Sequence, residues 1–148
     1  MESENQTIVA LIDFLNTAYL IKHKRKPKLE NYEKVRAKLQ SIDSRIKVLA
    51  IADPQSINII NQKKNYESYR DKGEIVQVGP GEEADYYMIK YAEKNPNYCI
   101  ISSDGFKNYN IEETLKERVI PVCIINGEVI FSKKLELFLK RFQKSNKI

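Results

Sequence analysis

The chain has 148 residues, of which 42% are hydrophobic and 30% are charged, as is typical of a globular domain in water. It has no apolar run near the ~20 residues of a membrane span, and its polar start, MESENQT, is not a secretory signal, so we expect a cytoplasmic protein without membrane contact. The formal net charge of +5 suits a polyanionic partner such as a nucleic acid, although many lysine-rich surfaces serve solubility alone.

Short apolar runs alternate along the chain with longer amphipathic stretches. Pro54 is a good first helical residue, Gly73 ends the stretch that follows it, and the turn NGE predicts a hairpin. In chain order we expect strand 8–12, helical turn 16–21, helix 31–42, strand 46–53, helix 54–71, strand 74–78, helix 83–94, strand 98–103, helix 111–118, strand 119–125, strand 129–132 and helix 133–142.

The alternation of strands with helices predicts an α/β fold. We expect one domain over residues 1–148, with three layers (α/β/α) and a central, mainly parallel sheet of about five strands. Binding sites in such sheets lie at the carboxyl ends of the strands, beside the point where the strand order reverses.

The cysteine and histidine content argues against a zinc site. Cys99 and Cys123 each lie in an apolar run, so we expect two buried, reduced thiols. Together with the single histidine, His23, they lack the spacing that zinc ligands have in sequence.

Three of the first four predicted strands end on an aspartate, at Asp13, Asp53 and Asp104. One such residue is common after a strand, where it caps a helix or begins a turn. Three carboxylates at one edge of a sheet repel each other, and a cation among them removes the repulsion. The pattern therefore favours a metal site over three separate caps.

A fourth acid comes from the start of helix 83–94. Asp85 shares the helix face of Met88, Ile89 and Ala92, so it points inward, although an acid in a first turn is also favoured by the helix dipole alone. Oxygen ligands without histidine or cysteine select Mg²⁺ or Mn²⁺. Asn16, three residues after the first strand, can orient a carboxylate or a water at the same site.

Three segments together resemble a known family. They are LIDFLNTAY, EEADYYMIKYA and CIISSDGFKNY, and in this order they are similar to the NYN branch of the PIN-like nucleases, especially the Regnase-type ribonucleases. The resemblance spans most of residues 7–125. It implies a Mg²⁺- or Mn²⁺-dependent ribonuclease that hydrolyses single-stranded or loop RNA, usually by internal cleavage, and it also implies a homodimer.

The resemblance assigns roles residue by residue. The catalytic residues it implies are Asp13, Asn16, Asp85 and Asp104, of which the three aspartates hold the metal. Ser102 supports the turn after the fourth strand. Family members often have an acid where this chain has Asn108, and a second aspartate where it has Ala84. Asp53 matches no family residue and is a supporting candidate by position alone.

A basic stretch, KHKRKPK, begins a few residues after Asn16. It offers RNA-backbone contacts, and a solvated loop or a localisation signal are the alternatives. The residues that we expect to bind RNA are Lys22, Lys24, Arg25 and Lys26.

Other functions fit the residues less well. DFLNT has the aspartate and threonine of a haloacid dehalogenase-type phosphatase loop, but Leu15 stands where the general acid is needed. The first strand lacks the paired acids of a receiver domain. It is also not followed by the G-x-G-x-x-G motif that binds a dinucleotide. The remaining alternative is a PIN-like domain without strong catalysis that binds RNA or protein, and Asn108 favours it.

Overall fold

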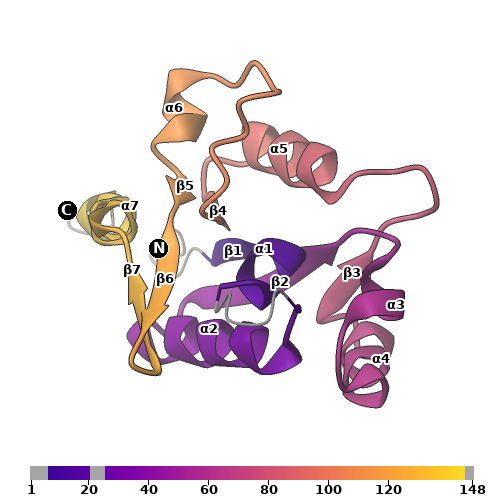
Figure 1. The fold of residues 1–148 in the computed structure, drawn as a ribbon. Helices are drawn as coiled ribbons and strands as arrows, with labels where there is room; N and C mark the ends of the chain where they lie inside the picture. The colour runs from indigo at the N-terminus through magenta and orange to yellow at the C-terminus, as the bar shows by residue number, and fades with distance from the viewer. Residues whose placement is uncertain (1–6, 21–25, 146–148) are drawn as a thin grey trace.

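The computed structural model of the chain describes residues 7–20 and 26–145 (Figure 1). Its described residues form a five-stranded parallel sheet with the strand order β3-β2-β1-β4-β5. This confirms the predicted α/β fold. The strands are β1 (Ile8–Asp13), β2 (Ile46–Ala52), β3 (Ile75–Gln77), β4 (Tyr98–Ile101) and β5 (Val119–Ile120).

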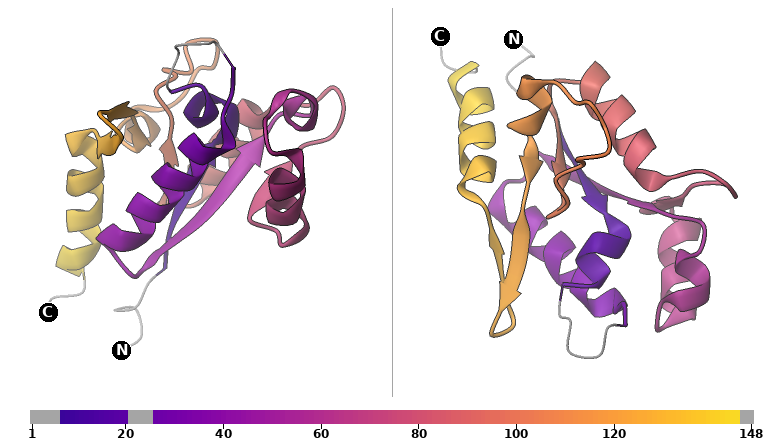
Figure 2. Two further views of the ribbon diagram at one scale, coloured as in Figure 1. Left: turned by 60° about the horizontal axis from the view of Figure 1, so that its bottom comes forward. Right: turned by 45° about the horizontal axis from the view of Figure 1, so that its top comes forward.

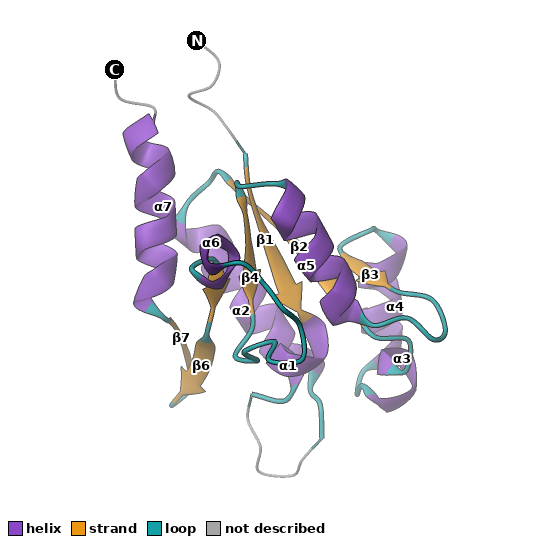
Figure 3. Ribbon diagram, turned by 90° about the horizontal axis from the view of Figure 1, so that it is seen from above, coloured by secondary structure: helices purple, strands orange, loops and turns teal. Residues whose placement is uncertain are grey.

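Helices cover both faces of this sheet, as Figure 3 shows from above. They are α1 (Phe14–Ala18), α2 (Leu29–Ile42), α3 (Ser56–Ile59), α4 (Lys63–Asp71), α5 (Ala84–Lys94), α6 (Glu113–Lys116) and α7 (Lys133–Ser145). In the described part of the chain, none of these helices combines the length and the apolar character that crossing a membrane requires.

Strand β1 lies at the centre of the sheet and is buried along its whole length. Its alternate side chains enter two separate cores, since successive residues of a strand point to opposite faces. Ile8, Ala10 and Ile12 pack in the core under α1 and α2, whereas Val9 and Leu11 pack in the core under α5. The continuous apolar run in the sequence is therefore explained by burial on both faces.

Two predicted elements are divided in the structure. The expected helix 54–71 is two helices, α3 and α4, because Gln62 adopts a left-handed φ of 53° between them. The expected strand 119–125 is also two strands. Pro121, which has no N–H to donate, separates β5 from β6 (Val122–Ile125).

Strand β6 leaves the main sheet and pairs antiparallel with β7 (Glu128–Phe131), as the hairpin prediction expected. Asn126 and Gly127 both have positive φ, at 50° and 79°, which a tight two-residue hairpin turn requires. The hairpin and α7 lie beyond β5 at one side of the sheet (Figure 2).

One prediction about the cysteines is wrong. Cys99 is buried in β4 with a free thiol, as expected, but the free thiol of Cys123 is exposed. In β6, Cys123 lies between the buried Val122 and the half-buried Ile124. Successive side chains of a strand point to opposite faces, and only one face of this hairpin is packed, so Cys123 points to solvent. An apolar run in a hairpin does not require burial on both faces.

Candidate metal centre

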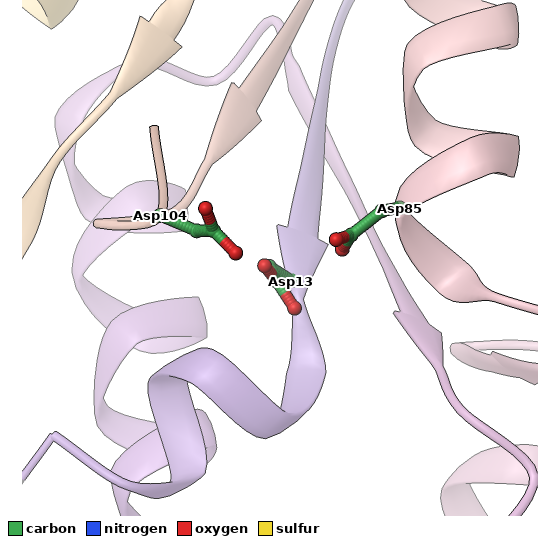
Figure 4. A group of neighbouring side chains, drawn as sticks. All are labelled: Asp13, Asp85 and Asp104. Carbon is green, nitrogen blue, oxygen red and sulfur yellow. The ribbon is translucent and has the colours of Figure 1, made fainter. Parts of the chain in front are cut away.

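Within the described residues, three carboxylates meet at the carboxyl edge of the sheet (Figure 4). Asp13 is the last residue of β1, Asp104 follows β4, and Asp85 lies in the first turn of α5. One oxygen from each lies within 4.8 Å of the others. Strands β1 and β4 are neighbours at the point where the strand order reverses, so the topology delivers two of these residues to one place.

Asp13 is the most buried member of the cluster, with 6% of its surface exposed. Its Oδ2 accepts a hydrogen bond of 2.8 Å from the Ser102 hydroxyl. Burial raises the pKa of Asp13 to about 7; the Ser102 hydrogen bond opposes this rise, and the charges of Asp85 and Asp104 add to it. The protein therefore holds this carboxyl in a place that disfavours its charge unless a cation is present.

Asp85 is half-buried at the start of α5. The prediction that it shares the inward face of the helix is confirmed, because Met88, Ile89 and Ala92 are all buried. Burial, followed by repulsion from Asp104 and Asp53, raises the pKa of Asp85 to about 6. Two of the three carboxyls thus have pKa values close to neutrality.

Asp104 is the exposed member of the cluster, and its loop is held in an unusual conformation. Its Oδ1 accepts a hydrogen bond of 2.8 Å from the Phe106 N–H, and Phe106 has a positive φ of 53°. Such a φ is costly for a bulky residue, and the buried Phe106 ring, only 2% exposed, maintains it. The buried ring thus anchors the loop that presents Asp104 to the cleft.

Two polar side chains join the elements of the site: Ser102, predicted to support it, and Asn16, predicted to be catalytic. The Ser102 hydroxyl donates to Asp13 and accepts a hydrogen bond of 3.0 Å from the Asp104 N–H, so it links two members of the cluster. The Oδ1 of Asn16 accepts a hydrogen bond of 2.9 Å from the Ser103 N–H, which ties α1 to the loop after β4. Asn16 therefore lies at the site, where its amide oxygen holds the loop after β4 to α1.

Asp53, the supporting candidate, acts on the start of α5. Its Oδ1 accepts a hydrogen bond of 2.8 Å from the Ala84 N–H, one of the donors that a helix start leaves unpaired. The residue follows β2, so it holds the helix that carries Asp85 against the sheet edge. It is not one of the three clustered carboxylates.

Replacing Asp53 by alanine should lower the free energy of unfolding by about 1 kcal/mol, because the N–H of Ala84 loses its acceptor. Urea unfolding followed by circular dichroism measures this difference. The matched control is Asp53→Asn, which keeps an oxygen acceptor and should lose less than half as much. Equal losses in the two variants would contradict the capping role.

The cluster opens into a cleft of about 600 Å³ lined by the three aspartates together with Asn16, Tyr19, Asp53 and Ser103. An adjoining hollow of about 580 Å³ shares Asp53 and Asp85 and is lined by Asn108 and Tyr109. Asn108 is exposed and shares this adjoining hollow with Asp85.

Sequence reasoning missed a contact between two loops of the site. The Tyr109 hydroxyl donates to the Glu83 carboxylate, which joins the loop after β4 to the residue directly before α5. This contact raises the pKa of Tyr109 well above its usual range. It links the segments that carry Asp104 and Asp85, and no local pattern indicates it because all of α5 and all of β4 separate the partners in the sequence.

The predicted RNA-binding residues are described only in part. Lys22, Lys24 and Arg25 lie outside the described residues, whereas Lys26 is exposed where the described chain resumes.

The donor set of the cluster suits a hard divalent cation. Every ligand atom is a carboxylate oxygen, which Mg²⁺ and Mn²⁺ prefer to nitrogen or sulfur. A cation would also remove the mutual repulsion that contributes to the raised pKa values of Asp13 and Asp85. The residues present therefore fit the metal that the sequence predicted.

Comparison with known proteins adds information about the fold. No family model matches the sequence, and no curated protein matches it. Among solved structures, the chain is similar to Arabidopsis thaliana nuclear protein-only RNase P 2 (PRORP2), with a TM-score of 0.64 and 17% identity over 86% of this chain. It spans only 29% of the PRORP2 chain. At this identity the similarity shows a common fold.

A second solved structure has lower similarity. The PIN domain endonuclease Utp24 gives a TM-score of 0.42 at 13% identity, covering 84% of this chain and 90% of that one.

Proposed function

We propose that this protein is a metal-dependent ribonuclease. The observation that carries the proposal is the convergence of Asp13, Asp85 and Asp104, with oxygen atoms within 4.8 Å of one another, at the carboxyl edge of a parallel sheet. Carboxylate metal sites serve several kinds of enzyme. The chain shares its fold with PRORP2, which is named as an RNase P, and this similarity supports a nuclease. The three segments that resemble the NYN branch and its Regnase-type members favour that branch.

In this proposal Asp13, Asp85 and Asp104 hold one or two Mg²⁺ or Mn²⁺ ions. A bound ion of this kind supplies an activated water and stabilises the charge that develops on the phosphate. The Ser102 hydroxyl would orient Asp13 for this task, and the exposed Asp104 would be the ligand nearest to an incoming substrate phosphate. Asn16, whose oxygen is already bonded to Ser103, has its amide N–H groups left to orient a carboxylate or a water.

The proposed substrate is single-stranded or loop RNA cut at internal bonds. Internal cleavage is what the resemblance to the Regnase-type ribonucleases implies. The basic residues Lys22, Lys24, Arg25 and Lys26 follow the α1 segment that lines the cleft and would contact the RNA backbone. The homodimer implied by the family resemblance stays a prediction.

A second candidate function is an RNA-binding or protein-interaction module with little catalysis. The observation that favours it is Asn108, which lies beside Asp85 at a position where the resembling family often has an acid. An uncharged amide there leaves the site with one carboxylate fewer to bind a second ion.

The deciding experiment is cleavage of an end-labelled single-stranded RNA with Mn²⁺, and again with excess EDTA. We expect a ladder of internal products with Mn²⁺ and intact RNA with EDTA. Cleavage that persists in EDTA would exclude the metal mechanism. Intact RNA that shifts on a native gel under both conditions would favour the binding module instead.

A further inference from the structure

The outward face of α5 carries a group of aromatic and basic side chains. Five positions fall on one arc of this helix, on the side away from the buried Met88, Ile89 and Ala92. We call this arc the tyrosine–lysine face, and its members are Tyr86, Tyr87, Lys90, Tyr91 and Lys94.

Two of the three rings on this face are open to solvent, whereas Tyr87 is half-buried and packs against the core. Tyr86 is 47% exposed and Tyr91 is 49% exposed, which is unusual for side chains that gain free energy by burial. Tyr86 and Tyr87 contact edge to face, with ring centroids 5.5 Å apart. The Lys90 ammonium lies 5.5 Å from the centre of the Tyr86 ring, so a cation and a flat π-surface are already paired there.

The face begins at the candidate metal centre. Tyr86 directly follows Asp85, and Tyr91 lies about 7.5 Å beyond Tyr86 along the helix axis at 1.5 Å per residue. Successive helix residues project about 100° apart, so a polymer bound at Asp85 reaches these rings by crossing the start of α5.

The chemistry of the face selects its partner. All five members of the arc are tyrosine or lysine, whereas the acidic Glu93 lies at its border. Exposed tyrosines also occur at protein interfaces, but lysine is depleted there, so the two lysines between these rings favour a polyanionic partner. Exposed rings with interspersed cations are the elements that bind single-stranded nucleic acid, by base stacking and by charge.

We propose that the tyrosine–lysine face of α5 is a stacking platform for unpaired bases of a single-stranded nucleic acid whose backbone passes through the metal centre. Tyr86 and Tyr91 stack the bases, while Lys90 and Lys94 contact the phosphates. This inference rests on the proposed function for the path of the nucleic acid through the metal centre. Binding of bases to α5 itself needs no catalysis.

The test measures binding without metal. A fluorescein-labelled single-stranded RNA is titrated with full-length protein in EDTA, and the Kd is read from fluorescence anisotropy. We expect the double variant Tyr86→Ala/Tyr91→Ala to weaken binding about tenfold or more, because each stacked base contributes substantially. The matched control, Tyr86→Phe/Tyr91→Phe, keeps both rings and should bind within about twofold of wild type.

Two further measurements separate stacking from charge. An oligonucleotide with abasic sites should bind wild type and the alanine variant with the same affinity, since it offers no bases to stack. Lys90→Ala/Lys94→Ala should reduce the slope of log Kd against log salt, because two phosphate contacts are lost. Leu137→Ala, an exposed side chain of α7, should change neither quantity.

The outcomes distinguish this inference from the proposed function. Weaker binding by the alanine variant, with or without RNA cleavage by the wild type, supports the platform. If wild type cleaves RNA in Mn²⁺ but the alanine variant binds as tightly as wild type, the platform is overturned and the nuclease stands. Absence of RNA binding by the wild type in EDTA overturns the platform as well.

Discussion

Replacing Asp13 by asparagine should stabilise the metal-free protein at pH 8 by about 2–4 kcal/mol while it lowers RNA cleavage in Mn²⁺ by on the order of 10²–10³ or more. These two effects have opposite signs, and both follow from the position of one carboxyl. Asp13 is buried at the end of β1, and its neighbours Asp85 and Asp104 are also acids.

The gain in stability follows from the raised pKa. A carboxyl whose pKa is about 7 in the folded protein is ionised at pH 8 at a free-energy cost, because the unfolded chain ionises it near 3.8. Asparagine has nearly the same shape and removes that charge. Its Oδ1 can still accept the Ser102 hydroxyl, and its amide can donate to a neighbouring carboxylate.

Urea unfolding in EDTA at pH 8 measures the gain, and cleavage of end-labelled RNA in Mn²⁺ measures the loss. Addition of Mn²⁺ should raise the melting temperature of wild type but not that of Asp13→Asn. The control is Asp71→Asn, an exposed aspartate of α4, which should change neither stability nor cleavage. A variant that is destabilised in EDTA would show that Asp13 has a structural role that does not depend on a metal.

The metal-free protein should lose about 2–4 kcal/mol of stability as the pH rises from about 4.5 to 8. Asp13 and Asp85 have folded pKa values of about 7 and about 6, both above the value of 3.8 expected for an unfolded chain. Between these values the folded state binds more protons than the unfolded state, so the free energy of unfolding falls with rising pH. The decline ends above pH 7, where both states have released these protons.

Mn²⁺ should reverse the sign of this dependence. A metal binds the ionised carboxylates and competes with protons for them, so its stabilising effect grows as the pH rises through 6 and 7. Unfolding free energies at five pH values, in EDTA and in Mn²⁺, give the two profiles. The double variant Asp13→Asn/Asp85→Asn should give a flatter profile that is the same in both buffers. A metal-free profile that rises over this interval would contradict the raised pKa values.

Much of the fold could be predicted because the pattern of each element is local. The apolar run of β1 and the helical spacing of Met88, Ile89 and Ala92 both reflect burial in the structure. The predictions that failed concern breaks within elements. The left-handed Gln62 divides a helix without a glycine to mark it, and Pro121 ends β5 where the chain leaves one sheet for another.

The candidate site could be predicted for the same reason. Asp13, Asp53 and Asp104 follow strands, and parallel strands bring their carboxyl ends to one edge whatever the details of packing. Their different roles could not be predicted, since they depend on distances of about an ångström. Asp104 joins Asp13 in the cluster, whereas Asp53 turns to the Ala84 N–H and caps α5.

The alternation of strands with helices, the aspartates that follow three of the strands and the inward position of Asp85 could all be predicted from the sequence, because they depend on neighbours in the chain. The convergence of three acids, the raised pKa of Asp13 and the contact of Tyr109 with the start of α5 required the folded structure. Burial and contact across the sheet are properties of distant segments brought together, and no local pattern encodes them.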